Sequence, residues 1–163
     1  MLIDAMIYLE DMVLLIAGDG DIKTQLRNRV IEKNLKLRIH FLGRIHPDAL
    51  YPVTCSADIG VTLEEDMGLN YRYALPNKMF DYTQARIPVL CSDLPEMKML
   101  VEKYSIGKVL TVRDPKALAS LIMQMLQEKR QGKWQETLEK AAGELCWEKE
   151  QKVLSEILEG MNI

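Results

Sequence analysis

A short polar run directly before a buried strand carries the side chains with the clearest capacity for chemistry. Asn77 and Lys78 stand at the start of an expected helix, Asp81 lies one turn later, and the strand opens with Pro88. Open α/β sheets bind their ligands at the carboxyl ends of their strands, beside such helix starts. An amide, an ammonium and the free N–H groups of a first helical turn can together bind phosphate. The run predicts a ligand site, and the alternatives are a plain helix cap, an exposed lysine and a solvent-facing aspartate.

A second candidate site is the loop Gly18-Asp19-Gly20, which follows an expected strand and precedes an expected helix. Its flexible backbone and the N-terminus of the helix can face a phosphate group. A tight strand-to-helix turn explains the same residues equally well. The third glycine of a dinucleotide-binding fingerprint is absent, so the loop does not indicate an NAD site.

Gly43 and Arg44 end a further expected strand at the same edge of the sheet. A glycine there lets a flat nucleobase approach the backbone. Arg44 can stack on a base or contact a phosphate, or it is an ordinary solvated arginine in a turn. His40 and His46 fit a strand position and a loop position better than catalytic roles, because neither has a partner in the local sequence.

Three consecutive acids, Glu64, Glu65 and Asp66, follow another expected strand. They suggest a divalent cation, since hard cations bind clustered carboxylates. Consecutive loop residues point in different directions, however, so a solvated loop explains these acids as well. We expect no metal site.

The composition limits the classes of partner. The 163 residues carry a net charge of −3 with 21 lysines and arginines, and nucleic acids or anionic membranes require a denser basic surface. No apolar run is long enough to cross a bilayer, and the N-terminus lacks the profile of a secretion signal. We therefore expect a cytoplasmic protein that does not bind nucleic acid. The three cysteines lie far apart in apolar segments, which predicts reduced core thiols at Cys55, Cys91 and Cys146.

Short β-branched runs that are apolar on both faces alternate with segments of helical period. This alternation predicts an α/β fold in a single domain over residues 1–163, with a Rossmann-like parallel sheet and helices on both faces. The expected strands are Val13–Ala17, Arg38–Leu42, Ile59–Leu63, Pro88–Cys91 and Lys108–Leu110, and expected crossover helices are Pro47–Cys55, Asn77–Ala85 and Pro95–Lys103.

Local signals mark where other helices begin and end. Asp21 is the expected cap of a helix that stops at Asn34 in a left-handed conformation. Asp114 and Pro115 are the expected cap and first-turn proline of another helix. The tail from about residue 133 predicts one or two amphipathic helices with these buried candidates: Trp134, Leu138, Leu145, Trp147, Val153, Leu154, Ile157 and Leu158.

Three runs together resemble a known family. They are Ala57-Asp58, the run from Leu75-Pro76-Asn77-Lys78 to Asp81 with Pro88-Val89, and Ser92-Asp93-Leu94-Pro95-Glu96. They are similar to the C-terminal, donor-binding domain of the group 1 (family 4) glycosyltransferases with the two-domain GT-B architecture, especially the capsule and surface-polysaccharide branch. The resemblance implies a retaining hexosyltransferase of polysaccharide biosynthesis that uses a nucleotide sugar as donor substrate and needs no cofactor.

The resemblance also assigns roles to residues. Asp81 occupies the position of the family's second glutamate, whose carboxylate accepts hydrogen bonds from both ribose hydroxyls, and it is one methylene shorter. Tyr73 occupies the position of the first glutamate, which lies near the transferred sugar, and no catalytic residue is assigned. The other donor-binding candidates are Lys78 and Asn77 with Gly18 and Gly20 for the diphosphate, and Gly43 and Arg44 for the base.

Two departures from the family bear on catalysis. Tyr73 removes the acid nearest the sugar, and Arg86 stands where the family usually has glycine, so that its side chain points outward or narrows the cleft. The family also has an earlier central strand, followed by a basic pair, and an N-terminal acceptor domain. We expect these to be missing here, which would leave a gap in the sheet, favour self-association and make the chain inactive alone. The full-length enzyme is expected in the cytoplasm or at the periphery of the inner membrane.

Two other functions fit the same residues. A non-catalytic nucleotide-binding or assembly module would retain the fold without turnover, and a nucleotide-sugar epimerase shares the two-domain architecture. Addition of an N-terminal domain separates them: sugar transfer or donor hydrolysis marks a glycosyltransferase, and interconversion of the sugar on its nucleotide marks an epimerase.

Overall fold

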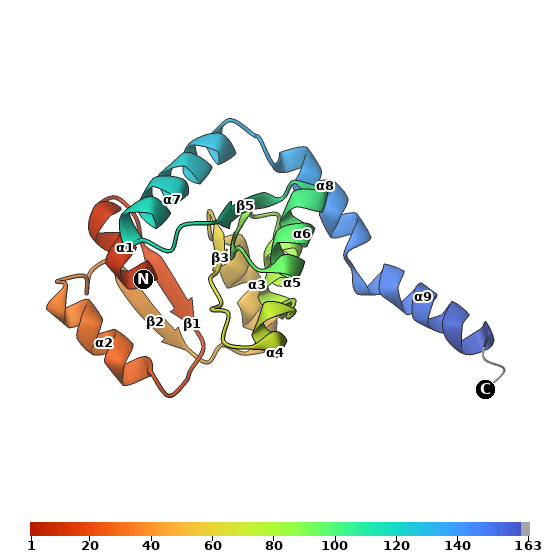
Figure 1. Ribbon diagram of the computed structural model, residues 1–163, viewed down its shortest axis with the longest axis horizontal. Helices are drawn as coiled ribbons and strands as arrows, with labels where there is room; N and C mark the ends of the chain where they lie inside the picture. Colours follow the sequence, from red (N-terminus) through yellow and green to blue (C-terminus); the bar gives the residue numbers. More distant parts are fainter. Residues whose placement is uncertain (161–163) are drawn as a thin grey trace.

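The computed structural model describes residues 1–160, which contain five parallel β-strands connected by helices (Figure 1). Each strand matches one expected apolar run, with its ends shifted by at most one residue. The strands are β1 (Leu14–Ala17), β2 (Ile39–Gly43), β3 (Gly60–Thr62), β4 (Val89–Ser92) and β5 (Gly107–Leu110). The predicted α/β class and the parallel direction of the strands are confirmed.

The strands form two separate parallel sheets instead of one continuous sheet. β1 pairs with β2, and the second sheet has the order β3-β4-β5. Leu14 aligns with Ile39 in the first sheet, and Gly60 aligns with Val89 in the second. Within the described residues, β1, β2, β3 and β5 therefore each have one strand neighbour and one open edge.

Helices connect the strands and continue after the last one. They are α1 (Leu2–Ala5), the short 3-10 helix η1 (Met6–Tyr8), α2 (Lys23–Glu32), α3 (Pro47–Cys55), α4 (Leu69–Arg72), α5 (Asn77–Gln84), α6 (Pro95–Tyr104), α7 (Pro115–Arg130), α8 (Gln135–Glu144) and α9 (Trp147–Gly160). The four-residue helix α4 is absent from the predicted elements, because so short a segment has no readable helical period.

Helices cover both faces of the three-stranded sheet. α5 and α6 pack against one face, where α8 contacts both of them, and α7 packs against β5 from the other side (Figure 1). Right-handed crossovers explain this arrangement, because β3, β4 and β5 follow one another in sequence and in space. The central strand is covered on both sides, and Val89, Leu90 and Cys91 are fully buried.

The first helical segment joins the two sheets. Met6 is buried, and both α1 and η1 contact α7, while α1 also contacts α2. The Arg38 guanidinium, just before β2, donates to the carbonyl oxygens of Met6 at 2.8 Å and Leu9 at 2.7 Å. Asp4 accepts from Arg29 Nε on α2 at 2.8 Å. Polar contacts thus fix this segment to the first sheet, and apolar packing fixes it to α7.

Three of the four predicted helix signals are confirmed, among them Pro115 as the first residue of α7. The Asp114 carboxylate accepts from the N–H groups of Lys116 and Ala117, both at 2.9 Å, and Asn34 is left-handed with φ of +56°. The cap predicted at Asp21 is wrong, since the N-terminus of α2 has no side-chain cap. The loop continues in a turn past Asp21, so the helix begins too late for that carboxylate to occupy the cap position.

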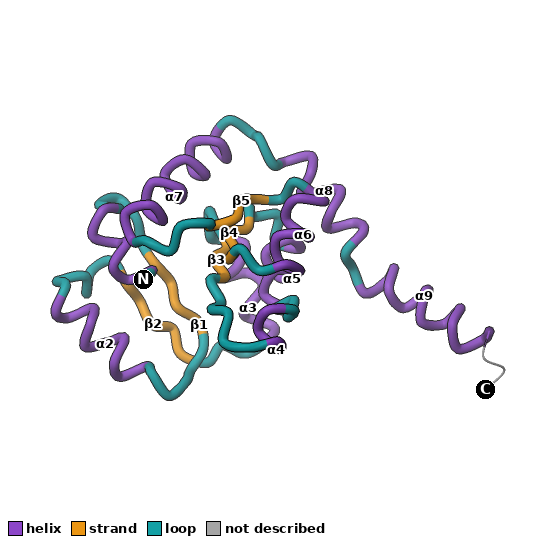
Figure 2. Tube along the Cα trace, viewed as in Figure 1, coloured by secondary structure: helices purple, strands orange, loops and turns teal. Residues whose placement is uncertain are grey.

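The two C-terminal helices differ in burial. Trp134 and Leu138 are buried, as predicted, and Leu145 is half-buried. In α9, by contrast, Trp147 is 64% exposed, and α9 extends away from the body of the domain (Figure 2). The prediction of burial is therefore wrong for the apolar side chains of α9, which are Trp147, Val153, Leu154, Ile157 and Leu158.

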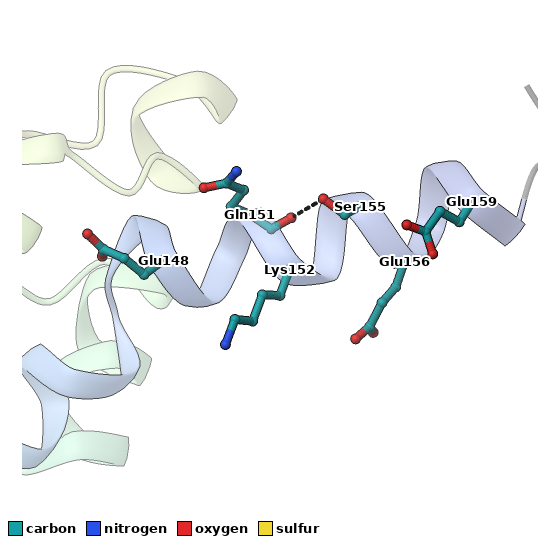
Figure 3. A pocket seen from close by; sticks show the side chains of 6 residues that line it. All are labelled: Glu148, Gln151, Lys152, Ser155, Glu156 and Glu159. Carbon is teal, nitrogen blue, oxygen red and sulfur yellow. Dashed lines mark hydrogen bonds between the residues drawn. The ribbon is translucent and has the colours of Figure 1, made fainter.

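The other side of α9 is polar. Figure 3 shows the side chains that line it, which are Glu148, Gln151, Lys152, Ser155, Glu156 and Glu159. The helix is amphipathic, as its residue spacing predicts. The hollow along its polar side is formed by this one exposed helix, so it offers no enclosed binding site.

Two further expectations concern membranes and thiols. No helix in the described part of the chain has the length and apolar composition to cross a membrane. The cysteines are free, with Cys91 buried, Cys146 half-buried and Cys55 exposed. Burial in the core is thus confirmed for Cys91 and wrong for Cys55, which lies at the solvent side of α3.

Gly107 approaches the backbone of β4 so closely that its replacement tests the packing of the second sheet. A β-carbon at Gly107 would lie 1.8 Å from the carbonyl oxygen of Val89. Gly107→Ala should therefore destabilise the domain by about 2–4 kcal/mol in urea unfolding. Gly143→Ala is the matched control, because nothing lies within 4 Å of a β-carbon there and alanine should stabilise α8 by about 0.5–1 kcal/mol. Equal stability of the two variants would contradict this packing.

Candidate functional site

The glycines predicted as ligand-binding residues in the first sheet meet at the carboxyl ends of β1 and β2. The Gly18 N–H donates to the Gly43 carbonyl oxygen at 2.7 Å. Their φ angles are +124° and +70°, a region that residues with a β-carbon rarely adopt. The two loops are therefore fixed against each other, and they bring Gly18, Gly20, Gly43 and Arg44 to one edge of the sheet.

Asp19 is an acid within this edge, and its contacts change the interpretation of the loop. Its carboxylate accepts from the Gly20 N–H at 3.0 Å and pairs with Lys23 Nζ at 3.1 Å. The hydrogen bonds from Lys23 and Gly20, with the nearby charges of Lys23 and Arg44, lower the pKa of Asp19. The Gly20 N–H is thus already occupied, and a phosphate at this loop would have to displace a carboxylate.

The second group of predicted residues lies on α5, opposite the end of β3. Lys78 Nζ donates to Glu64 Oε1 at 2.7 Å, and Thr62 Oγ1 donates to Glu64 Oε2 at 2.6 Å. Burial acts to raise the pKa of Glu64, but the hydrogen bonds from Lys78 and Thr62 and the charge of Lys78 outweigh it and leave the pKa lowered. Glu64 and Lys78 therefore form an ion pair beside the first turn of α5.

Arg113 and Ser92 complete this cluster, although the sequence analysis did not name them as site residues. The Arg113 guanidinium, which follows β5, donates to the carbonyl oxygens of Leu63 at 3.2 Å and Glu64 at 3.0 Å, and to Ser92 Oγ at 3.1 Å. Ser92 ends β4 and donates to the Glu64 carbonyl oxygen at 2.7 Å. One arginine therefore links the carboxyl ends of β3, β4 and β5. Its position after an expected strand was the signal that could have identified it.

Asp81 lies one turn after Lys78 on α5 and has a different environment from Glu64. Its carboxylate has no hydrogen-bond or ion-pair partner among the described residues, and desolvation by burial raises the pKa of Asp81. Asp81 is nevertheless an exposed residue, as the alternative of a solvent-facing aspartate predicts, so its desolvation is partial and its carboxylate remains open to solvent. Acids with a shifted pKa are enriched in functional sites. Asp81 is thus available to accept hydrogen bonds from a ligand.

Asn77 and Tyr73 are exposed residues at the same end of the domain. Asn77 is the first residue of α5, and this helix has no side-chain cap, so the interpretation of Asn77 as a cap is wrong. Tyr73 is 57% exposed and follows α4, in a loop that Arg72 closes by donating from Nε to Asp66 at 2.9 Å. Tyr73 therefore lies on a surface loop.

The three consecutive acids point toward different cations, as expected for a loop. Within residues 1–160 no group of three or more histidine, cysteine, aspartate or glutamate side chains is placed to hold a metal ion. The cations that face Glu64, Glu65 and Asp66 are Lys78, Arg113 and Arg72.

The two groups of candidate residues are separate in the described structure. No hydrogen bond or ion pair among residues 1–160 joins the β1–β2 loops to the cluster around Lys78. Both groups nevertheless follow the carboxyl ends of parallel strands, the edge at which α/β domains bind their ligands. β1 and β2 point toward the lower part of Figure 1, where α4, the helix after β3, also lies.

Residues 1–128 match the family described as group 1 glycosyl transferases. This match extends from the first residue of the chain through most of α7. The chain belongs to this family. No curated protein matches this chain in sequence.

Solved structures share the fold of this chain. A sucrose-phosphate synthase from Thermosynechococcus elongatus aligns with a TM-score of 0.77 and 21% identity, over 98% of this chain and 41% of that protein. WaaG, a glycosyltransferase involved in lipopolysaccharide biosynthesis, aligns with a TM-score of 0.68 and 15% identity, over 86% of this chain and 38% of that protein. The catalytic domain of a cholesterol-α-glucosyltransferase from Helicobacter pylori aligns with a TM-score of 0.64 and 16% identity, over 88% of this chain and 86% of that domain.

These alignments identify the fold as parallel sheets flanked by helices, as in one half of a GT-B glycosyltransferase. The chain spans 41% of the length of the sucrose-phosphate synthase and 38% of the length of WaaG. The likeness therefore concerns one part of these two longer proteins.

Arg86, just after α5, points toward α8. It is left-handed, with φ of +55°, and its Nε donates to Glu139 Oε2 at 2.8 Å. Gln84 Nε2 donates to the carbonyl oxygens of Ala142 and Leu145 on the same side, both at 2.9 Å. Of the two orientations predicted for Arg86, the structure has the outward one, in which the side chain ties the end of α5 to α8.

Asp81 should lower the stability of the free domain at neutral pH, because its pKa is higher in the folded than in the unfolded chain. A folded acid with a raised pKa binds more protons than the unfolded acid, so its contribution to the unfolding free energy falls as pH rises through the carboxyl range. Asp81→Asn should therefore unfold at a higher urea concentration than wild type at pH 7. The difference should shrink when the pH falls below the ordinary carboxyl pKa.

Glu64→Gln is the control for this measurement, because its stability should change in the opposite direction at pH 7. The pKa of Glu64 is lowered in the folded chain, so its ionised form contributes stability that is present at pH 7 and lost on acidification. Glu64→Gln should therefore lose stability at pH 7. If both variants changed stability in the same direction, the environments assigned to the two acids would be wrong.

Proposed function

We propose that this chain is the donor-binding part of a retaining, nucleotide-sugar-dependent glycosyltransferase. The observation that carries the proposal is the placement of an exposed, unpaired carboxylate, Asp81, one helical turn after a cation, Lys78, at the carboxyl edge of a parallel sheet. A nucleoside diphosphate presents complementary groups, because its ribose offers two hydroxyl donors and its diphosphate offers charged acceptors. Membership of the group 1 glycosyltransferase family supports the same assignment.

The proposed roles follow from the chemistry of each side chain. Asp81 accepts hydrogen bonds from both ribose hydroxyls, and such charge-assisted bonds contribute about 1.5–3 kcal/mol each. Lys78, with the first-turn N–H groups of α5 beside the exposed Asn77, binds the diphosphate. The loops with Gly18, Gly20, Gly43 and Arg44 complete the donor site on the first sheet, where Arg44 contacts the base or a phosphate.

In the proposed reaction, the glycosidic bond to the nucleoside diphosphate breaks through an oxocarbenium-like transition state. Negative charge grows on the departing diphosphate, and cationic side chains and backbone N–H groups stabilise it. Lys78 supplies such a charge in this chain. The acceptor would bind to an N-terminal domain, and we propose that the chain alone binds donor weakly and transfers no sugar.

The proposed pathway is surface-polysaccharide biosynthesis in the cytoplasm or at the periphery of the inner membrane, with a hexosyl group as the transferred sugar. The alignment with WaaG, which is involved in lipopolysaccharide biosynthesis, supports this choice. The alternative of a non-catalytic nucleotide-binding module is favoured by two observations. Tyr73 lies on an exposed loop where the family has an acid near the sugar, and Asp19 occupies the Gly20 N–H.

Binding of a nucleoside diphosphate tests the proposed donor site. Titration calorimetry with UDP, GDP and ADP should give saturable binding of one of them, and Asp81→Ala should weaken it by about 2 kcal/mol, or about 30-fold. Asp11→Ala is the matched control, because Asp11 is an exposed acid before the amino end of β1, at the opposite edge of the sheet. No binding of any nucleotide, or equal losses in the two variants, would overturn the donor-site proposal.

Self-association follows from the open strand edges. β1, β2, β3 and β5 each have one neighbour among the described strands, and unpaired edges favour pairing with another chain. Sedimentation velocity should show an average mass that rises with protein concentration, and the thermal midpoint should rise with it. A constant monomer mass and a thermal midpoint independent of concentration would contradict self-association.

A further inference from the structure

Glu64 is held in place by contacts from several elements. Its carbonyl oxygen accepts from Ser92 Oγ at 2.7 Å and from Arg113 at 3.0 Å, while its carboxylate accepts from Thr62 at 2.6 Å and from Lys78 at 2.7 Å. The side chain is only 20% exposed. Both the backbone and the carboxylate are thus fixed, so the contact of Glu64 with Lys78 belongs to a rigid arrangement at the strand ends.

This arrangement limits the motion of Lys78, whose side chain is 48% exposed. A lysine ammonium has three N–H donors, and Glu64 takes one of them, which leaves two for a ligand. Fixing a long, flexible side chain costs rotamer entropy, and this cost is removed from the binding step when the free protein already holds the side chain. A carboxylate partner can therefore strengthen phosphate binding by a lysine although it carries negative charge.

The charges around the cluster permit an anion to approach. The charged groups that face one another at the ends of the second sheet are Lys78 and Arg113 against Glu64 and Glu65. Within these contacts the two cations balance the two acids, and the further acid nearby is Asp81, unpaired among the described residues, which the proposed function assigns to the ribose hydroxyls. Arg113 binds carbonyl oxygens of the β3 end, which fixes the Glu64 backbone and leaves the ammonium of Lys78 as the ligand-facing cation.

We propose that Glu64 is a positioning residue that orients Lys78 for the phosphate of the ligand, and that Arg113 and Ser92 hold Glu64 for this purpose. The proposal rests on the proposed function, because it gives Lys78 a phosphate to bind. Glu64 acts through Lys78 and does not itself touch the ligand. The strength of phosphate binding then depends on contacts that span three strands and one helix.

A double-mutant cycle tests this role. The binding constant of the nucleoside diphosphate that wild type binds should weaken about tenfold in Glu64→Gln and at least as much in Lys78→Met. The double variant should bind no more weakly than Lys78→Met alone, because Glu64 has no effect once the ammonium is absent. A purely structural role for Glu64 would instead weaken binding equally in both backgrounds, and that result would overturn the proposal.

A matched control and a second variant complete the test. Glu139→Gln removes the carboxylate that pairs with Arg86, just after α5, at 2.8 Å. This variant should leave the binding constant of the nucleoside diphosphate unchanged. Thr62→Val removes the other hydrogen bond to the Glu64 carboxylate while the charge and volume are kept. Thr62→Val should weaken binding a few-fold when Lys78 is present and should have no effect in the Lys78→Met variant. It replaces Glu64→Gln in the test if that variant fails to fold.

The outcomes separate this proposal from the donor-site proposal. Tighter binding in Glu64→Gln would mean that Glu64 competes with the ligand for Lys78, and unchanged binding would mean that Lys78 needs no positioning. Either result overturns the role of Glu64 while the donor site stands. If wild type bound no nucleoside diphosphate, both proposals would fall together.

Discussion

The packing of α1 and η1 against α7 is the contact on which the rest of the structure depends. No strand pairing joins the two sheets within the described residues, so side-chain packing holds them together. Arg38 binds carbonyl oxygens of η1 and the loop after it, which fixes this segment to the first sheet. Close packing of apolar side chains resists displacement even without directional hydrogen bonds. The relative position of the two groups of candidate ligand-binding residues is set by this contact.

Electrostatics at the strand ends divides the charged residues into two kinds. Lys78, Glu64 and Arg113 are paired, and their contacts connect the three strands of the second sheet to α5. Asp81, one turn further along α5, is exposed and has no partner among residues 1–160, and the partial burial of its carboxyl group raises its pKa. The first kind is stabilised by hydrogen bonds within the protein, whereas the second has no partner in the described part of the chain and is exposed to solvent. The proposed donor site requires this combination of a fixed frame and one carboxylate without such a partner.

Sequence patterns predicted the positions of the helices and strands of this domain more accurately than the contacts that these elements make. Alternating apolar runs located all the strands, since a run that is apolar on both faces is stable only between two layers of helices. The same kind of pattern failed for α9, whose apolar side chains are exposed. Periodicity reports that a helix has an apolar face, but it does not report what covers that face. Arg113 was missed for a related reason, because its partners Glu64 and Ser92 are distant in sequence.

The sequence by itself determined the α/β class, the positions of the strands, the cap at Asp114 and the likeness to the glycosyltransferases, because each depends on local composition and spacing. The tertiary structure alone decided the split into two sheets, the outward direction of Arg86, the occupation of the Gly20 N–H by Asp19 and the ion pair between Lys78 and Glu64. These features arise where elements meet in space. Their energies depend on distance and desolvation between groups, which residue order does not specify.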